Sequence, residues 1–194
     1  MAAGKVITGY SLPWVAKYAA NEGTITFSDA MRLARGVSVT VSPEGSDDNN
    51  FYADNVLAES DSGRFTGGTT TLEVDGLLIA AERFIMGLPE ADQDGWTHYG
   101  DDQAIPYIAI GFIVRYMSDG VTTYVPYVLV KNKFKPIETE ANTQEAEIDW
   151  QTTSLEAVTM RSDDSNHNWK YVGADFPTEA EAEAALKTKL GVSA

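Results

Sequence analysis

The chain has 194 residues, no cysteine, and 14 basic against 29 acidic residues, which gives a formal net charge of −15. This length suits one domain of good size and is short for two. The missing cysteines exclude disulfides, thiol catalysis and cysteine-ligated zinc, and the acidic field disfavours binding to nucleic acid or anionic membranes.

Apolar residues do not form a run long enough for a signal peptide near the N-terminus, or one near the roughly 20 residues that cross a bilayer. We therefore expect a protein that is made in the cytoplasm, has no membrane partner and stays soluble until it is assembled.

The first half of the chain is dominated by strand signals. In the stretch 31–42, Val37, Val39 and Val41 alternate with polar residues, which indicates a strand with one apolar and one polar face. Pro43 and Gly45 are expected to stop it. The strands predicted in this half cover residues 14–19, 24–28, 31–42, 51–60 and 71–75, with a turn at 21–23 and a bulge or joint at Gly67–Gly68.

The second half contains two helices and the strongest hairpin signal. Apolar residues at spacings of three and four predict a helix over 76–88, which Gly87 and Pro89 end. Two β-branched and aromatic runs, 105–117 and 121–131, flank Asp119-Gly120 and predict a hairpin. Pro106 and Pro126 favour an edge position or a bulge there. A further strand is predicted over 150–161, and a helix over 178–190 begins with Thr178 and Glu181 as a capping box.

These elements predict a mainly β fold, a β-sandwich or partly open barrel with one packed helix, plus a C-terminal helix. We expect a single domain over 1–194, with extended loops near 43–50 and 60–70.

Residues with catalytic or ligand chemistry are sparse. His98 and His167 lie in polar loops without a second ligand at metal spacing. The stretch 92–95 resembles only the start of a calcium loop, and 47–50 is more typical of an acidic turn than of a cation site. We therefore predict that the protein is not an enzyme and uses no metal or cofactor.

Several motifs follow one another in a recognisable order: Ser-Pro-Glu-Gly at 42–45, Phe-Tyr-Ala-Asp-Asn-Val at 51–56, Leu-Glu-Val at 72–74, the apolar helix, the Asp-Gly hairpin, and Phe-Pro-Thr-Glu-Ala-Glu-Ala-Glu-Ala at 176–184. In this order they resemble the major tail protein, or tail tube protein, of long-tailed bacteriophages with flexible, non-contractile tails. The resemblance covers nearly the whole chain, and its most specific part is 37–56.

The resemblance implies a structural virion protein with a β-sandwich flanked by a helix, located in the tail tube. Six copies would form a ring, and rings would stack into a hollow tube that conducts DNA during genome ejection. The implied partners are further copies of the chain, other tail proteins such as tape measure, terminator and baseplate proteins, and DNA in transient passage.

A lumen lined by acidic and hydroxyl side chains would let DNA slide, whereas a basic lining would hold it by counterion release. The polar faces of the predicted strands supply five lumen candidates: Ser38, Thr40, Asp54, Glu73 and Glu156. A slip of one residue in register would turn each of them to the other face. Candidates for contacts between subunits are Arg32, Arg35, Asp47, Asp48, Lys131, Lys133 and Lys135.

Two alternatives remain at this point. One is a related component that forms a ring without stacking, such as a tail terminator or baseplate hub, or the tube of a phage-tail-like bacteriocin. The other is a carbohydrate-binding β-sandwich that uses Trp96, Trp150 and Tyr107 as a platform.

Overall fold

A computed structural model describes residues 4–61, 63–101, 103–144, 148 and 150–192. The chain is mainly β, as predicted, with one large antiparallel sheet and two helices. The elements, in chain order, are β1 (Val6–Asn21), β2 (Thr24–Arg32), β3 (Gly36–Gly45), β4 (Asn49–Ala53), β5 (Val56–Asp61), β6 (Phe65–Val74), α1 (Ile79–Met86), β7 (Ile108–Ser118), β8 (Val121–Phe134), β9 (Thr153–Met160), β10 (Lys170–Val172) and α2 (Glu179–Lys189).

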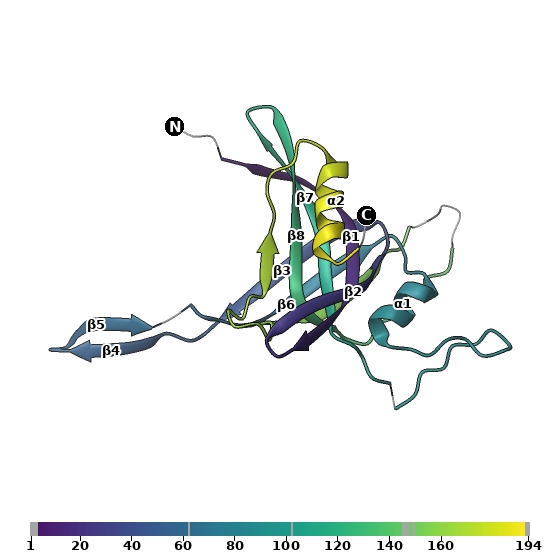
Figure 1. The fold of residues 1–194 in the computed structure, drawn as a ribbon, viewed down its shortest axis with the longest axis horizontal. Coiled ribbons are helices and arrows are strands. Elements are labelled where there is room, and N and C mark those ends of the chain that lie inside the picture. The colour runs from purple at the N-terminus through teal and green to yellow at the C-terminus, as the bar shows by residue number, and fades with distance from the viewer. Residues whose placement is uncertain (1–3, 62, 102, 145–147, 149, 193–194) are drawn as a thin grey trace.

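The large sheet has the strand order β2-β1-β7-β8-β9-β6-β3, and β10 pairs with β8 beside β9. The sheet curls so that its β3 end approaches β1: a methyl group added to Gly36 would lie 2.2 Å from the Tyr10 ring. This curvature gives the sheet an inner and an outer face (Figure 1). β4 and β5 form a separate two-stranded hairpin that projects from the body.

The inner face holds the main core. Leu72 and Val74 of β6, Leu155 of β9 and Ile110 of β7 are fully or almost fully buried there. α1 contributes Ala81, Ile85 and Met86 to the same cluster. α1 ends at Gly87, whose φ of 66° is left-handed, so the helix that the sequence predicted over 76–88 is present but shorter.

A second cluster forms where α2 covers the outer face of β1, β7 and β8. Leu186 and Leu190 pack against Ala109 and Ile113. Gly111 lets the helix come close, because a Cβ there would lie 2.8 Å from the Leu186 side chain. Since β7 is covered on both faces, its residues 108–114 are all buried, which explains why this run is continuously apolar.

A chain of polar side chains crosses the buried interior between β6, β9 and β8. Thr70 and Thr159 join their hydroxyls at 2.6 Å, and Thr159 donates to Asn132 Oδ1 at 2.8 Å. Asn132 Nδ2 donates to the carbonyl oxygens of Ile108 and Leu129 at 3.0 and 2.9 Å. All three side chains lie at 0–1 % exposure, so each donor that folding removes from water finds an acceptor.

The hairpin β7–β8 confirms the prediction from Asp119-Gly120, and both residues have positive φ. The prolines do not follow the sequence expectation. Pro106 lies before β7, and Pro126 lies inside β8 opposite Ile113, with β10 on the other side of the strand. Pro126 is accommodated because β10 ends opposite Tyr127 and Gly173 then donates to the Pro126 carbonyl. β8 is therefore not an edge strand.

Three other expectations are corrected. The segment 51–60 is not one strand, because Asp54 and Asn55 adopt φ of 50° and 60° and reverse the chain between β4 and β5. The expected loop 43–50 is largely strand, since β3 reaches Gly45 and β4 begins at Asn49. Most of 60–70 belongs to β5 and β6. The predicted bulge lies next to Gly67, because the pairing register shifts between Phe65 and Gly67. Gly68 itself pairs regularly with Pro43 and permits close strand approach, because a Cβ there would be 2.7 Å from the Ser42 carbonyl oxygen.

Candidate assembly surfaces

The outer face of β3, β6 and β9 is polar and is not covered by α2. Buried and less buried residues alternate along β6 and β9, which places Leu72 and Leu155 inside and their neighbours outside. Ser38 lies opposite Glu73, Thr40 lies opposite Thr71, and Thr71 lies opposite Glu156. The outward residues of the three strands are Ser38, Thr40, Ser42, Thr69, Thr71, Glu73, Ser154, Glu156 and Val158. We call this set the polar face.

Four of the five lumen candidates lie on the polar face: Ser38, Thr40, Glu73 and Glu156. Glu73 accepts hydrogen bonds from Thr152 at 2.6 Å and from Ser38 at 3.0 Å, and these bonds lower the pKa of its carboxyl group. Asp54 does not join the other four, because it lies in the turn at the tip of the β4–β5 hairpin. The sequence reasoning missed this turn. Its signal is the Asp54-Asn55 pair, because Asp and Asn tolerate the positive φ that a tight turn requires.

Three of the five basic candidates for subunit contacts are paired within the chain. Arg35 forms an ion pair with Asp75, Lys131 with Asp163 at 2.7 Å, and Lys135 with Glu156. The Lys131 ammonium also lies 4.6 Å from the centre of the Tyr107 ring, and its side chain is only 14 % exposed. The structure thus gives these three side chains partners within the chain itself.

The remaining candidates for subunit contacts are exposed. Arg32 ends β2 and lies opposite Trp14, while Lys133 lies opposite Val158 at the border of the polar face. Asp47 and Asp48 lie in the short link between β3 and β4. The structure does not bring these four residues into one cluster, so any contacts they make with other subunits would lie at different places.

The β4–β5 hairpin exposes large apolar side chains on both of its faces. Tyr52 lies opposite Leu57 on one face, and Ala53 lies opposite Val56 on the other. Phe51 and Tyr52 are both 62 % exposed, and Val56 is 65 % exposed. An isolated two-stranded hairpin is marginally stable in water, and exposed apolar surface of this kind marks an interaction site.

Among the strands that the structure describes, β2 and β3 end the sheet, and each pairs on one side only. Their other sides present backbone donors and acceptors that another strand can satisfy. Pro43 lies near the end of β3. Because β3 is an edge strand, the N–H group that proline lacks is not needed for pairing there.

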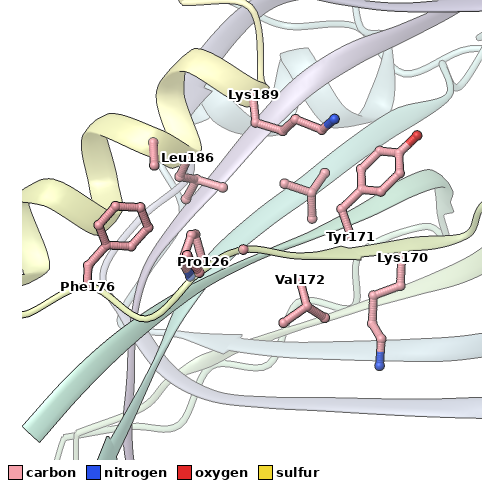
Figure 2. A pocket seen from close by; sticks show the side chains of 11 residues that line it. Pro126, Lys170, Tyr171, Val172, Phe176, Leu186 and Lys189 are labelled. Carbon is pink, nitrogen blue, oxygen red and sulfur yellow. The ribbon is translucent and has the colours of Figure 1, made fainter.

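A groove of about 470 Å³ lies between β10 and α2. Its apolar lining includes Pro126, Val128 and Leu186. Figure 2 shows Tyr171 pointing toward Lys189 on α2, and the Lys189 ammonium lies 4.1 Å from the centre of the Tyr171 ring. Lys170 also lines the groove, and none of the described lining residues is acidic. We call this feature the β10–α2 groove.

The aromatic residues proposed as a sugar platform are not joined to one another. Tyr107 packs edge-on against Tyr18, with ring centres 6.5 Å apart. Trp96 and Trp150 are strongly exposed, and among the described ring pairs neither one stacks with Tyr107.

Asp92 organises its own loop. Its Oδ1 accepts the N–H groups of Asp94 and Trp96, and its Oδ2 lies 2.8 Å from His98 Nε2. The hydrogen bond with His98, with the backbone bonds, lowers the pKa of Asp92. Over the part of the chain that the structure describes, no group of three metal-ligating side chains is found. The described helices are also too short to cross a membrane.

The fold and these surfaces define a mainly β protein with one curled antiparallel sheet, unpaired edges and a projecting apolar hairpin. Compared with models of known protein families and with curated protein sequences, the chain gives no match.

Proposed function

We propose that the protein is a tail tube subunit of a long-tailed bacteriophage, which polymerises as stacked rings around a DNA-conducting channel. The observation that carries the proposal is the polar face, where hydroxyl and carboxylate side chains of three neighbouring strands form one uncovered surface. Any sheet face exposed to water needs polar side chains. The polar face differs in that few positive charges on or beside it lack an ion-pair partner.

The charges on and beside the polar face support a channel lining. DNA carries about one negative charge per 1.7 Å, and each phosphate that a lysine or arginine neutralises adds salt-dependent affinity. Of the lysines at the border of the polar face, Lys131 and Lys135 are held by Asp163 and Glu156. Ser38, Thr40 and Thr71 offer phosphate only weak, uncharged hydrogen bonds. Such a lining lets DNA pass without being retained.

The unpaired edges and the hairpin supply the means of assembly. Joining β2 or β3 to a strand of a neighbouring subunit would satisfy backbone groups that the free subunit leaves to water. Rings of six remain an inference from the sequence resemblance, as does the virion location.

Electron microscopy of concentrated protein, with size exclusion on the same sample, tests the proposal. We expect hollow tubes or stacked rings. Single rings that never stack would favour a terminator or baseplate hub. A protein that stays monomeric at every concentration and binds sugar would overturn the proposal.

The lining itself is tested with a single cysteine, because the natural chain has none. Thr40→Cys on the polar face should react in tubes with a small maleimide but not with a maleimide attached to a globular protein too wide for the bore. Ala180→Cys, at the exposed start of α2, is the control on the face covered by that helix. Equal reaction of Thr40→Cys with both reagents would place the polar face outside.

A further inference from the structure

A groove of about 510 Å³ lies between β1 and β3, where the curled sheet is not closed. β2 pairs with β1 only from Trp14 to Asn21, so residues 6–12 of β1 have no strand partner on that side over the described chain. β3 approaches this part of β1 at Gly36, which packs against the Tyr10 ring. We call this space the β1–β3 groove. Its volume lies within the roughly 300–1,000 Å³ that small-molecule sites occupy.

The walls of the β1–β3 groove offer a continuous apolar strip. Val37, Val39 and Val41 occupy alternate positions of β3 and all line the groove, so together they span about 13 Å along the strand. Phe112 and Val114 of β7 line the same space and belong to the inner core. Val37 is 50 % exposed in the free chain. An extended alkyl tail would cover this strip and remove apolar surface from water.

One positive charge accompanies the aromatic rings of this groove. The Lys170 ammonium lies 5.9 Å from the centre of the Tyr127 ring and 4.8 Å from that of Trp169. Figure 2 shows the Lys170 side chain directed away from Tyr171 and Lys189, as expected for neighbouring residues of one strand. Lys170 and Tyr127 both line the β1–β3 groove, and none of its described lining residues is acidic. No described carboxylate forms an ion pair with Lys170.

Two tyrosine hydroxyls add a hydrogen-bond donor. The Tyr116 and Tyr127 hydroxyl oxygens lie 2.7 Å apart, and both residues line the groove. One hydroxyl donates to the other, so the hydrogen of the second is not used by that bond. Burial and the bond with Tyr116 raise the pKa of Tyr127 to about 12, which keeps its proton in place at neutral pH. Asp175 also raises this pKa, but Lys5 holds Asp175 in an ion pair.

The groove beside α1 contains more basic residues, but their charges are used within the chain. Lys17 pairs with Asp29 at 3.0 Å, and Arg83 pairs with Glu90 at 3.3 Å. Glu90 also lines that groove. An anion entering there would have to displace a carboxylate, whereas Lys170 has no described carboxylate to lose.

We propose that the β1–β3 groove binds one molecule of an aliphatic monocarboxylate, a fatty-acid-like amphiphile. The alkyl tail lies along the valines of β3, and the carboxylate accepts hydrogen bonds from Lys170 and from the Tyr116–Tyr127 hydroxyl pair. One cation matches one carboxylate, and such charge-assisted bonds are stronger than neutral ones. Because the net charge of −15 repels anions elsewhere on the chain, an anion needs a specific site to bind. The site lies within one subunit and does not depend on tube assembly.

Protection of a single cysteine by dodecanoate locates the site. Val37→Cys places a thiol in the β1–β3 groove, and Val172→Cys places one in the β10–α2 groove. The two valines are matched in exposure, at 50 % and 52 %. With unassembled protein and dodecanoate below its micelle concentration, we expect maleimide to react severalfold more slowly with Val37→Cys. The reaction of Val172→Cys should not change.

Calorimetric titration with dodecanoate tests the two halves of the site. Lys170→Gln should weaken binding about tenfold, as loss of one charge-assisted hydrogen bond does. Lys189→Gln, which removes the lysine over Tyr171 in the other groove, is its control and should have no effect. Val39→Asp should abolish binding, because it puts a carboxylate among the apolar side chains. Thr40→Asp adds the same charge to the outer face of the same strand and should preserve binding.

Each arm has a result that contradicts the proposal. Absence of dodecanoate binding by the unmodified chain would overturn it, as would equal protection of Val37→Cys and Val172→Cys. Equal effects of Lys170→Gln and Lys189→Gln would exclude the assigned carboxylate position, even if Val39→Asp failed to fold. Labelling of Val37→Cys that slows as protein concentration rises, without dodecanoate, would show that a second copy covers the groove and would also overturn the proposal.

Discussion

Replacing Asn132 with alanine removes the centre of the buried polar chain that links β6, β9 and β8. The hydrogen bonds of this polar chain all run in one direction. Asn132 must donate its two N–H groups to carbonyl oxygens, so its Oδ1 accepts from Thr159. Because the Thr159 hydrogen is used there, Thr70 must donate to Thr159.

The direction of the chain sets the size of each effect. Asn132→Ala strands the carbonyl oxygens of Ile108 and Leu129, which are bonded through Asn132 Nδ2. A buried group left without its partner costs about 1–3 kcal/mol, and partial recovery through strand hydrogen bonds leads us to expect a total loss of about 2–4 kcal/mol. Thr70→Val should cost only about 0.5–1 kcal/mol, because Thr159 loses an incoming bond and no donor is stranded.

Urea denaturation, at concentrations where size exclusion shows unassembled protein, measures these losses. Asn21→Ala is the control, since Asn21 lies exposed at the end of β1. The expected order of destabilisation is Asn132→Ala, then Thr70→Val, then Asn21→Ala. A Thr70→Val variant as unstable as Asn132→Ala would refute the direction assigned to the polar chain.

Two further perturbations test other parts of the fold. Lys131 lowers the pKa of Asp163 below its usual 3.8, so this pair stabilises the folded state above about pH 4 and loses its effect as pH falls through the lowered pKa. Asp163→Asn should flatten the acid limb of the stability profile, and an unchanged limb would contradict this assignment. Gly87→Ala should cost at least about 2 kcal/mol in thermal unfolding, because φ is 66° and a Cβ would lie 2.3 Å from the Ala104 carbonyl oxygen. A Gly87→Ala variant with an unchanged melting temperature would exclude this strain.

Local signals determined the elements whose chemistry is complete within a few residues. The Asp119-Gly120 turn formed where two β-branched runs required it. Thr178 caps α2 by accepting the Glu181 N–H, and Gly87 ends α1. Alternation also assigned the sides of β3 and β6 correctly, because only one face of these strands is buried. Four lumen candidates share a face for this reason.

Only the tertiary structure decided which strands and side chains become partners across the sheet. Pro126 looked like an edge residue, but its place inside β8 depends on where β10 ends, about 45 residues away in sequence. The ion pairs of Lys131 and Lys135 depend on loops and strands that follow much later in the chain. The sequence gives no sign that Thr70, Asn132 and Thr159 are buried, because their hydrogen-bond partners come from four different strands. Sequence patterns report the period of a strand, whereas the partners of each side chain are set by the order in which the strands pair.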